Sequence, residues 1–66
     1  MTLLSAKALE ILQAKAAAGK TSFSDLDIMV PLNLSYPSTD RVISELEDLG
    51  YIVVNHQYVS VSFRLA

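Results

Sequence analysis

The segment that decides the fold spans residues 46–52, which read Leu46-Glu47-Asp48-Leu49-Gly50-Tyr51-Ile52. Leu46 and Leu49 lie one helical turn apart, near the expected end of a helix, and their side chains are expected to pack in the core. Gly50 follows them, and glycine readily adopts the left-handed conformation that stops a helix. Ile52 then returns to the core as part of a strand. The segment therefore predicts a helix that turns sharply into a β-hairpin.

The helix that leads into this turn begins at Ser35. Serine is a favoured N-cap residue, because its hydroxyl accepts a hydrogen bond from a free N–H of the first turn. Pro37 stands in that first turn, where its missing N–H is not needed. Apolar residues then recur at intervals of three and four, at Val42, Ile43, Leu46 and Leu49. The pattern predicts a helix over residues 35–49.

Downstream of Gly50 the apolar period changes from helical to two, which is typical of strands. Residues 51–54 are predicted as the first strand, and residues 55–57 as the tip of the hairpin. In the second strand one side carries Val59, Val61, Phe63 and Leu65, and the other carries Tyr58, Ser60, Ser62 and Arg64. The chain is therefore expected to end in a hairpin with one face on the core.

Upstream, residues 3–18 read as a helix that is capped by Thr2 and ended by Gly19. Its apolar side is expected to carry Leu4, Ala8, Ile11, Leu12 and Ala18. Residues 20–23 follow as a minimal edge strand. With Lys15, Lys20 lies near the negative end of the helix dipole.

A second, short helix is predicted from Ser24, where Asp27 completes a capping box with that serine. Its apolar side is expected to carry Leu26, Met29 and Val30. Pro31 ends or kinks it, and Asn33 suits the turn that follows because asparagine tolerates a positive φ.

Composition excludes several functional classes. The chain has 66 residues, enough for one domain over residues 1–66. It has no cysteine, so thiolate metal sites and cysteine nucleophiles are excluded. His56 is the only histidine, and a solvated residue at a hairpin tip is the expected reading. We predict no catalytic residues, no cofactor, no metal site, no membrane span and a cytoplasmic location.

Charge is unevenly distributed. Basic residues number 5 and acidic residues 7, and hydrophobic residues make up 52% of the chain. Within residues 38–50, Arg41 stands against Asp40, Glu45, Glu47 and Asp48, a net charge of −3. A nucleic-acid-binding domain is usually basic. The high hydrophobic content instead suggests that some apolar side chains remain on the surface and are available to a partner. These are expected on the first helix or on an exposed strand edge.

The predicted order is helix, short strand, helix, turn, helix and hairpin, which is the order of a winged helix and defines an α+β fold. Residues 32–52 resemble the recognition-helix segment of winged helix-turn-helix regulators, and the MarR and ArsR groups are the most similar. The shared features are Leu32, Leu34 and Ser35, the polar helix with Arg41, and the ending Leu46 to Ile52.

The resemblance implies that helix 35–49 enters the major groove of double-stranded DNA and that the hairpin is the wing. The DNA-binding residues that it implies are Ser35, Tyr36, Ser38, Thr39, Arg41 and Ser44 on the helix, with His56 and Arg64 on the wing. Such a protein is a transcriptional regulator or an accessory nucleoprotein factor. With so few cations we expect weak binding by a monomer, and a homodimer would double the contacts.

The residues on the predicted DNA-binding surface also allow other interpretations. Arg41 is placed either to contact DNA or to pair with Glu45 one turn along the helix. Tyr36 either contacts a base or covers the start of its helix. Asp40 departs from the family pattern and would repel phosphate, and the predicted wing tip has few cations. The alternative function is a winged-helix module that binds a protein partner and no DNA.

Overall fold

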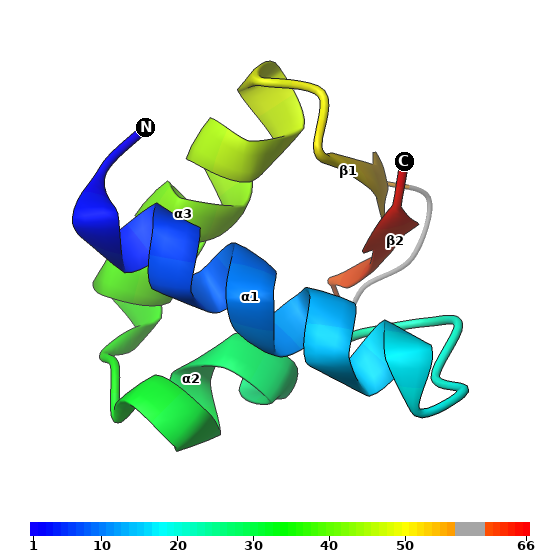
Figure 1. Ribbon diagram of the computed structural model, residues 1–66. Coiled ribbons are helices and arrows are strands. Elements are labelled where there is room, and N and C mark those ends of the chain that lie inside the picture. The colour runs from blue at the N-terminus through cyan, green and yellow to red at the C-terminus, as the bar shows by residue number, and fades with distance from the viewer. Residues whose placement is uncertain (57–60) are drawn as a thin grey trace.

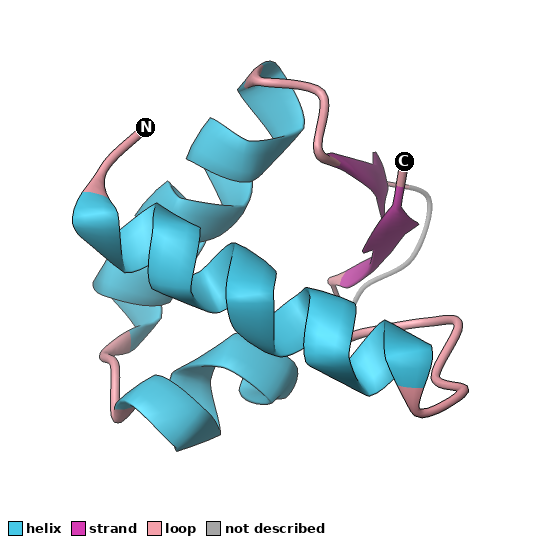
Figure 2. Ribbon diagram, viewed as in Figure 1, coloured by secondary structure: helices cyan, strands magenta, loops and turns pink. Residues whose placement is uncertain are grey.

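The structure, a computed structural model, describes residues 1–56 and 61–66. Three helices are followed by a C-terminal antiparallel hairpin, which lies at one end of the helical layer (Figures 1 and 2). The elements are α1 (Leu3–Ala17), α2 (Leu26–Leu32), α3 (Tyr36–Asp48), β1 (Ile52–Asn55) and β2 (Ser62–Leu65). The predicted α+β fold class is confirmed, and the arrangement is winged-helix-like.

The helix ends follow from the capping residues. The Thr2 side chain accepts a hydrogen bond from the Ser5 N–H at the start of α1. Ser35 does the same for the Ser38 N–H at the start of α3. Positive φ angles then end all three helices, at Gly19 (105°), Asn33 (52°) and Gly50 (82°), as predicted.

Helix α2 differs from the prediction in which side faces the core. Its buried residues are Asp27 and Ile28, whereas Leu26 and Val30 are 52% and 71% exposed. Pro31 lies within the helix, which continues for one more residue to Leu32. The predicted apolar side of this helix was therefore wrong. In a helix of seven residues, few positions were available to indicate the period.

The core draws on every element. Its buried apolar residues are Ala8, Leu9, Leu12, Phe23, Ile28, Val42, Ile43, Leu46, Ile52 and Phe63. Leu46 is fully buried, as expected, but Leu49 is 51% exposed. The expectation that Leu49 fills the core was wrong, because α3 ends at Asp48 and the chain turns away there.

The hairpin pairs Ile52 with Leu65 and Val54 with Phe63. Phe23 forms an isolated antiparallel bridge to Phe63, with N–O distances of 2.8 and 3.0 Å. The two phenyl rings are stacked, with centroids 5.9 Å apart. The predicted short edge strand at residues 20–23 is therefore present as a one-residue bridge. The expectations for Gln57, Tyr58, Val59 and Ser60 lie outside the described residues.

Candidate nucleic-acid interface

The outer face of α3 is the surface that the winged-helix arrangement would present to DNA. Val42, Ile43 and Leu46 bind the helix to the core, and the residues between them turn outward. The predicted residues that are exposed on this helix are Tyr36, Arg41 and Ser44, together with Asp40. Tyr36 is 63% exposed, so most of its side chain faces solvent.

Thr39 does not belong to this surface. Its side chain is fully buried, and its hydroxyl donates a hydrogen bond to the carbonyl oxygen of Ser35 at 2.9 Å. We therefore correct the prediction that Thr39 contacts DNA. A threonine on the core side of a helix is accommodated by bonding back to the preceding turn. Thr39 lies three and four residues before Val42 and Ile43, so the helical period places it on the core face, although its polar type suggested exposure.

Ser35 and Ser38 are engaged with each other at the start of α3. The Ser35 hydroxyl lies 3.1 Å from the Ser38 hydroxyl and accepts from the Ser38 N–H at 3.3 Å. The Thr39 N–H donates to the Ser35 carbonyl, and Pro37 has no N–H to offer. The donors that a phosphate would use here are largely satisfied within the helix. Ser35 therefore acts first as a cap.

Arg41 and Glu45 do not pair, although they lie one turn apart. The carboxylate of Glu45 instead accepts a hydrogen bond from the backbone N–H of Thr2 at 2.6 Å. Within residues 1–56 and 61–66, no ion pair involves the exposed Arg41. Arg41 and Glu45 both line a shallow groove of about 280 Å³ between the start of α1 and α3, to which Leu4 and Val42 contribute apolar side chains.

His56 joins the hairpin to α3. Its Nε2 lies 2.8 Å from Oε2 of Glu47, and the two side chains are 72% and 35% exposed. Both groups are near water, so this contact contributes little to stability. In this contact the imidazole of His56 and the carboxylate of Glu47 are each other's partners.

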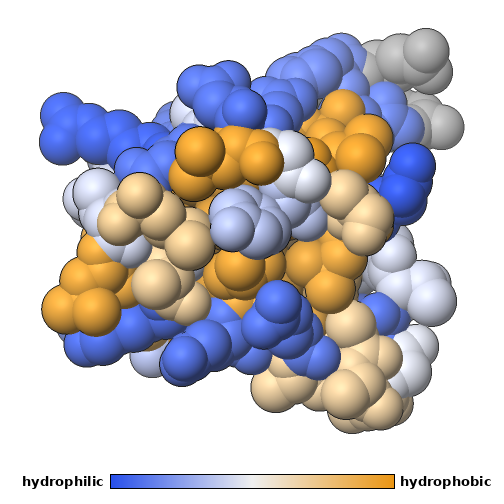
Figure 3. Space-filling view, turned by 45° about the horizontal axis from the view of Figure 1, so that its top comes forward, coloured by the Kyte–Doolittle hydropathy of each residue, from blue (hydrophilic) through white to orange (hydrophobic). Residues whose placement is uncertain are grey.

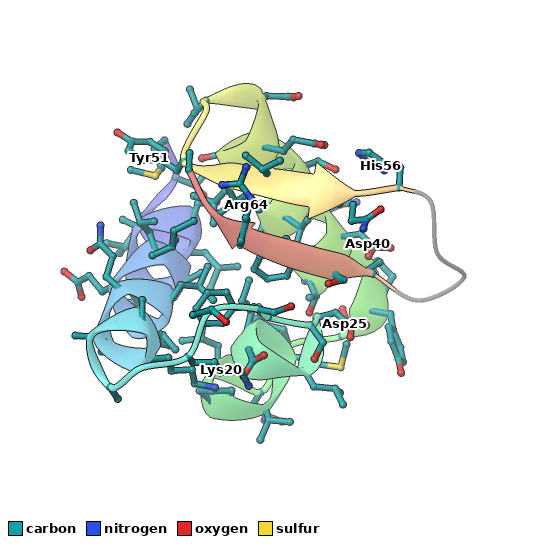
Figure 4. The ribbon with its side chains drawn as sticks, turned by 90° about the vertical axis from the view of Figure 1, so that its right-hand side faces the viewer. Lys20, Asp25, Asp40, Tyr51, His56 and Arg64 are labelled. Atoms are coloured by element: carbon teal, nitrogen blue, oxygen red, sulfur yellow. The ribbon has the colours of Figure 1, made fainter. Side chains whose placement is uncertain are left out.

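Arg64 lies apart from the other candidates. Its Nη1 donates to the carbonyl oxygen of Leu65 at 3.2 Å. Figure 4 shows Arg64 over the outward face of the two strands, whereas His56 lies beyond the far end of β1, on the side toward Asp40. The structure therefore brings Arg41 and Ser44 together on one helix but does not gather both wing candidates beside them.

A charge cluster around the buried carboxylate of Asp27, between the end of α1 and the start of α2, was not predicted from the sequence. Oδ1 of Asp27 lies 2.8 Å from Lys15 Nζ and 2.7 Å from Lys20 Nζ, and Oδ2 accepts from the Ser24 N–H. Burial raises the pKa of Asp27, but the hydrogen bonds from Lys15, Lys20 and Ser24 outweigh it and lower the pKa from 3.8 to about 2. The capping box explained only the Ser24 contact.

This cluster decides which cations are available to a ligand. Lys15 and Lys20 are bound to Asp27, so Lys7, Arg41 and Arg64 are the remaining basic side chains. On α3 itself, Glu45 and Glu47 are engaged as described, and Asp40 and Asp48 are exposed. Two of the four carboxylates of α3 thus have partners other than Arg41, although Asp40, Glu45 and Asp48 line the same shallow surface groove as Arg41.

Apolar side chains also reach the surface. Figure 3 shows orange residues lying among blue ones on one face of the molecule. The large apolar side chains that are at least two-fifths exposed are Met1, Leu3, Leu26, Val30, Tyr36, Leu49, Tyr51 and Val53. The apolar surplus in the composition is therefore partly at the surface.

Comparisons with protein-family models, with curated proteins and with solved structures find no match. Among the described residues, no group of three or more histidine or acidic side chains is arranged to hold a metal ion. No helix in the described part of the chain is long and apolar enough to cross a membrane.

Proposed function

We propose that this chain is a small winged-helix DNA-binding protein of the MarR or ArsR type, acting as a transcriptional regulator or an accessory nucleoprotein factor in the cytoplasm. In this proposal α3 enters the major groove, with Tyr36, Arg41 and Ser44 toward the bases and phosphates. His56 and Arg64 make secondary contacts from the hairpin.

The observation that supports the proposal most directly is that Arg41 is exposed and forms no ion pair within the described residues. An exposed arginine on a recognition helix is suited to a bidentate contact with guanine or to a phosphate. The competing explanation was an ion pair with Glu45, and that carboxylate is instead engaged by Thr2. Arg41 is thus exposed and forms no ion pair in the described structure, so its guanidinium is available to a phosphate or a base.

The charge balance limits the expected affinity. Each phosphate contact adds to both the affinity and its salt dependence. One copy offers Arg41, with Arg64 at a distance, so binding by a monomer is expected to be weak. Two copies would double the contacts and read two half-sites.

The test is fluorescence anisotropy with a labelled 20-base-pair duplex of mixed sequence, titrated at low and moderate salt. We expect Arg41→Ala to weaken binding about tenfold and to reduce the salt slope by about 1. Lys20→Gln removes the same charge outside α3, at a lysine that is paired with Asp27, and should change binding much less. Equal effects of the two variants, or no binding by the parent protein at low salt, would contradict the proposal.

One observation favours a second function, a module that binds a protein. Leu49, Tyr51 and Val53 are 51%, 44% and 43% exposed and lie close in sequence where α3 leads into β1. Exposed apolar residues beside acidic ones suit a protein partner better than DNA. A stoichiometric protein partner that is lost in Tyr51→Ser, together with no binding to the duplex, would favour this function.

A further inference from the structure

Helix α1 has two faces that differ less in character than is usual for a surface helix. Its core face carries Ser5, Ala8, Leu9 and Leu12, all buried. The opposite face is an exposed row, here called the outer stripe, formed by Leu3, Lys7, Glu10, Ala14 and Ala17. A surface helix normally turns a mainly polar face to water. Three of the five stripe residues are instead apolar, so this face has the composition of a surface that is covered.

The two charges of the outer stripe are arranged symmetrically. If two copies of α1 pack antiparallel through the outer stripe, with the two-fold axis midway between Lys7 and Glu10, residue numbers that face each other add up to 17. Lys7 then faces Glu10 of the partner subunit, and Glu10 faces Lys7 of the partner subunit. Leu3 faces Ala14 of the partner subunit, where a small side chain leaves room for it. A two-fold interface needs such self-complementarity.

We propose that the outer stripe from Leu3 to Ala14 is a homodimer interface, in which two copies of α1 pair antiparallel in this register and Ala17 lies outside the paired residues. Neither Lys7 nor Glu10 forms an ion pair within residues 1–56 and 61–66, so both are available to the partner. Leu3 is 73% exposed, the highest value among the large apolar side chains described, and pairing would cover it.

Pairing through this stripe leaves the candidate DNA-binding surface open. The outer stripe lies on the side of α1 opposite its buried residues, which pack into the core with α2 and α3, and Figure 1 shows α1 crossing in front of α3. Two copies would therefore each present an α3. The interface stands independently of DNA binding, since its argument uses α1 alone. One pair of 15-residue helices makes a small interface, and we expect a dissociation constant of about 10 to 100 μM.

The test is sedimentation equilibrium from micromolar to millimolar protein, without DNA. We expect Lys7→Glu alone and Glu10→Lys alone to weaken self-association at least tenfold, because each places like charges opposite one another. Mixing the two variants in equal amounts should restore dimers, because every facing pair is then of opposite charge. Attraction or repulsion between residues 7 and 10 within one chain is unchanged by mixing, so restoration reports the contact between subunits.

Two further variants test the apolar part of the interface. Ala14→Arg should abolish dimers, because it fills the space that faces Leu3 of the partner subunit. Ala18→Arg introduces the same side chain beyond the overlapping residues and should leave dimers intact. Circular dichroism melts show whether each variant is folded. A parent protein that is monomeric at millimolar concentration, dimers that survive Ala14→Arg, or charge variants that fail to recover on mixing would each overturn the proposal.

Discussion

Lys15 Nζ lies 2.8 Å from Oδ1 of Asp27 and thereby joins the last turn of α1 to the first turn of α2. Lys20 adds a second contact to the same oxygen at 2.7 Å. The carboxylate is 8% exposed, whereas the two lysines are 33% and 48% exposed. The burial of the acid makes its loss costly, because the position of α2 relative to α1 depends on a charge that is removed from water.

Asp27→Asn is expected to lower the free energy of unfolding by about 2 kcal/mol. The neutral amide loses the charge attraction of two lysines, although these can return to water. Asp25→Asn is the matched control, because Asp25 caps the same helix through the Leu26 N–H and asparagine caps equally well. Urea denaturation measures both. Equal losses in the two variants would show that capping, and not the lysine contacts, explains the effect.

Acid should weaken the fold over a defined range. The pKa of Asp27 is about 2 in the folded chain, below the ordinary value of 3.8. A lowered folded-state pKa contributes stability that is present above the unfolded pKa and is lost as the pH falls through the folded one. We expect a loss of about 2 kcal/mol between pH 4 and pH 2 from this group. Urea midpoints across this range should fall less steeply for Asp27→Asn than for the parent.

Leu46→Ala and Leu49→Ala should differ sharply, although the two leucines lie three residues apart. Leu46 is fully buried, so its truncation leaves a cavity and should cost about 3 kcal/mol. Leu49 is 51% exposed, and its truncation should cost less than about 1 kcal/mol. Thermal and urea unfolding give both values. Similar costs for the two variants would contradict the burial described for this helix end.

Asp40→Asn should strengthen DNA binding if α3 enters the major groove. Asp40 is exposed beside Arg41, and its carboxylate repels phosphate. We expect an increase in affinity of about threefold at low salt. Asp48→Asn makes the same charge change at the other end of α3 and should have a smaller effect. Anisotropy with the duplex described above measures both, and a loss of affinity in Asp40→Asn would contradict the assigned face.

The positions of the helices could be predicted because their ends depend on local chemistry. Thr2 and Ser35 supply cap oxygens, and Gly19, Asn33 and Gly50 take the positive φ angles that stop each helix. These effects act within a few residues of the chain. The sequence therefore indicates them without knowledge of the fold.

The candidate site was less predictable because its contacts join distant residues. Asp27 meets Lys15 and Lys20, and Glu45 meets Thr2 from 43 positions away. No spacing rule signals such pairs. Thr39 shows the opposite problem, since its polar type suggested exposure while its hydroxyl was satisfied by Ser35 within the same helix.

The bridge between Phe23 and Phe63 also protects the sheet. Because Phe23 bonds to the side of β2 that faces away from β1, Phe63 has a neighbour on each side, and within the described residues β1 presents a free edge of four residues. Short edges are poor templates for pairing between chains. A chain that is 52% hydrophobic is thereby given some resistance to growing sheets and fibres, and Phe23→Asp should increase aggregation on heating as well as lower stability.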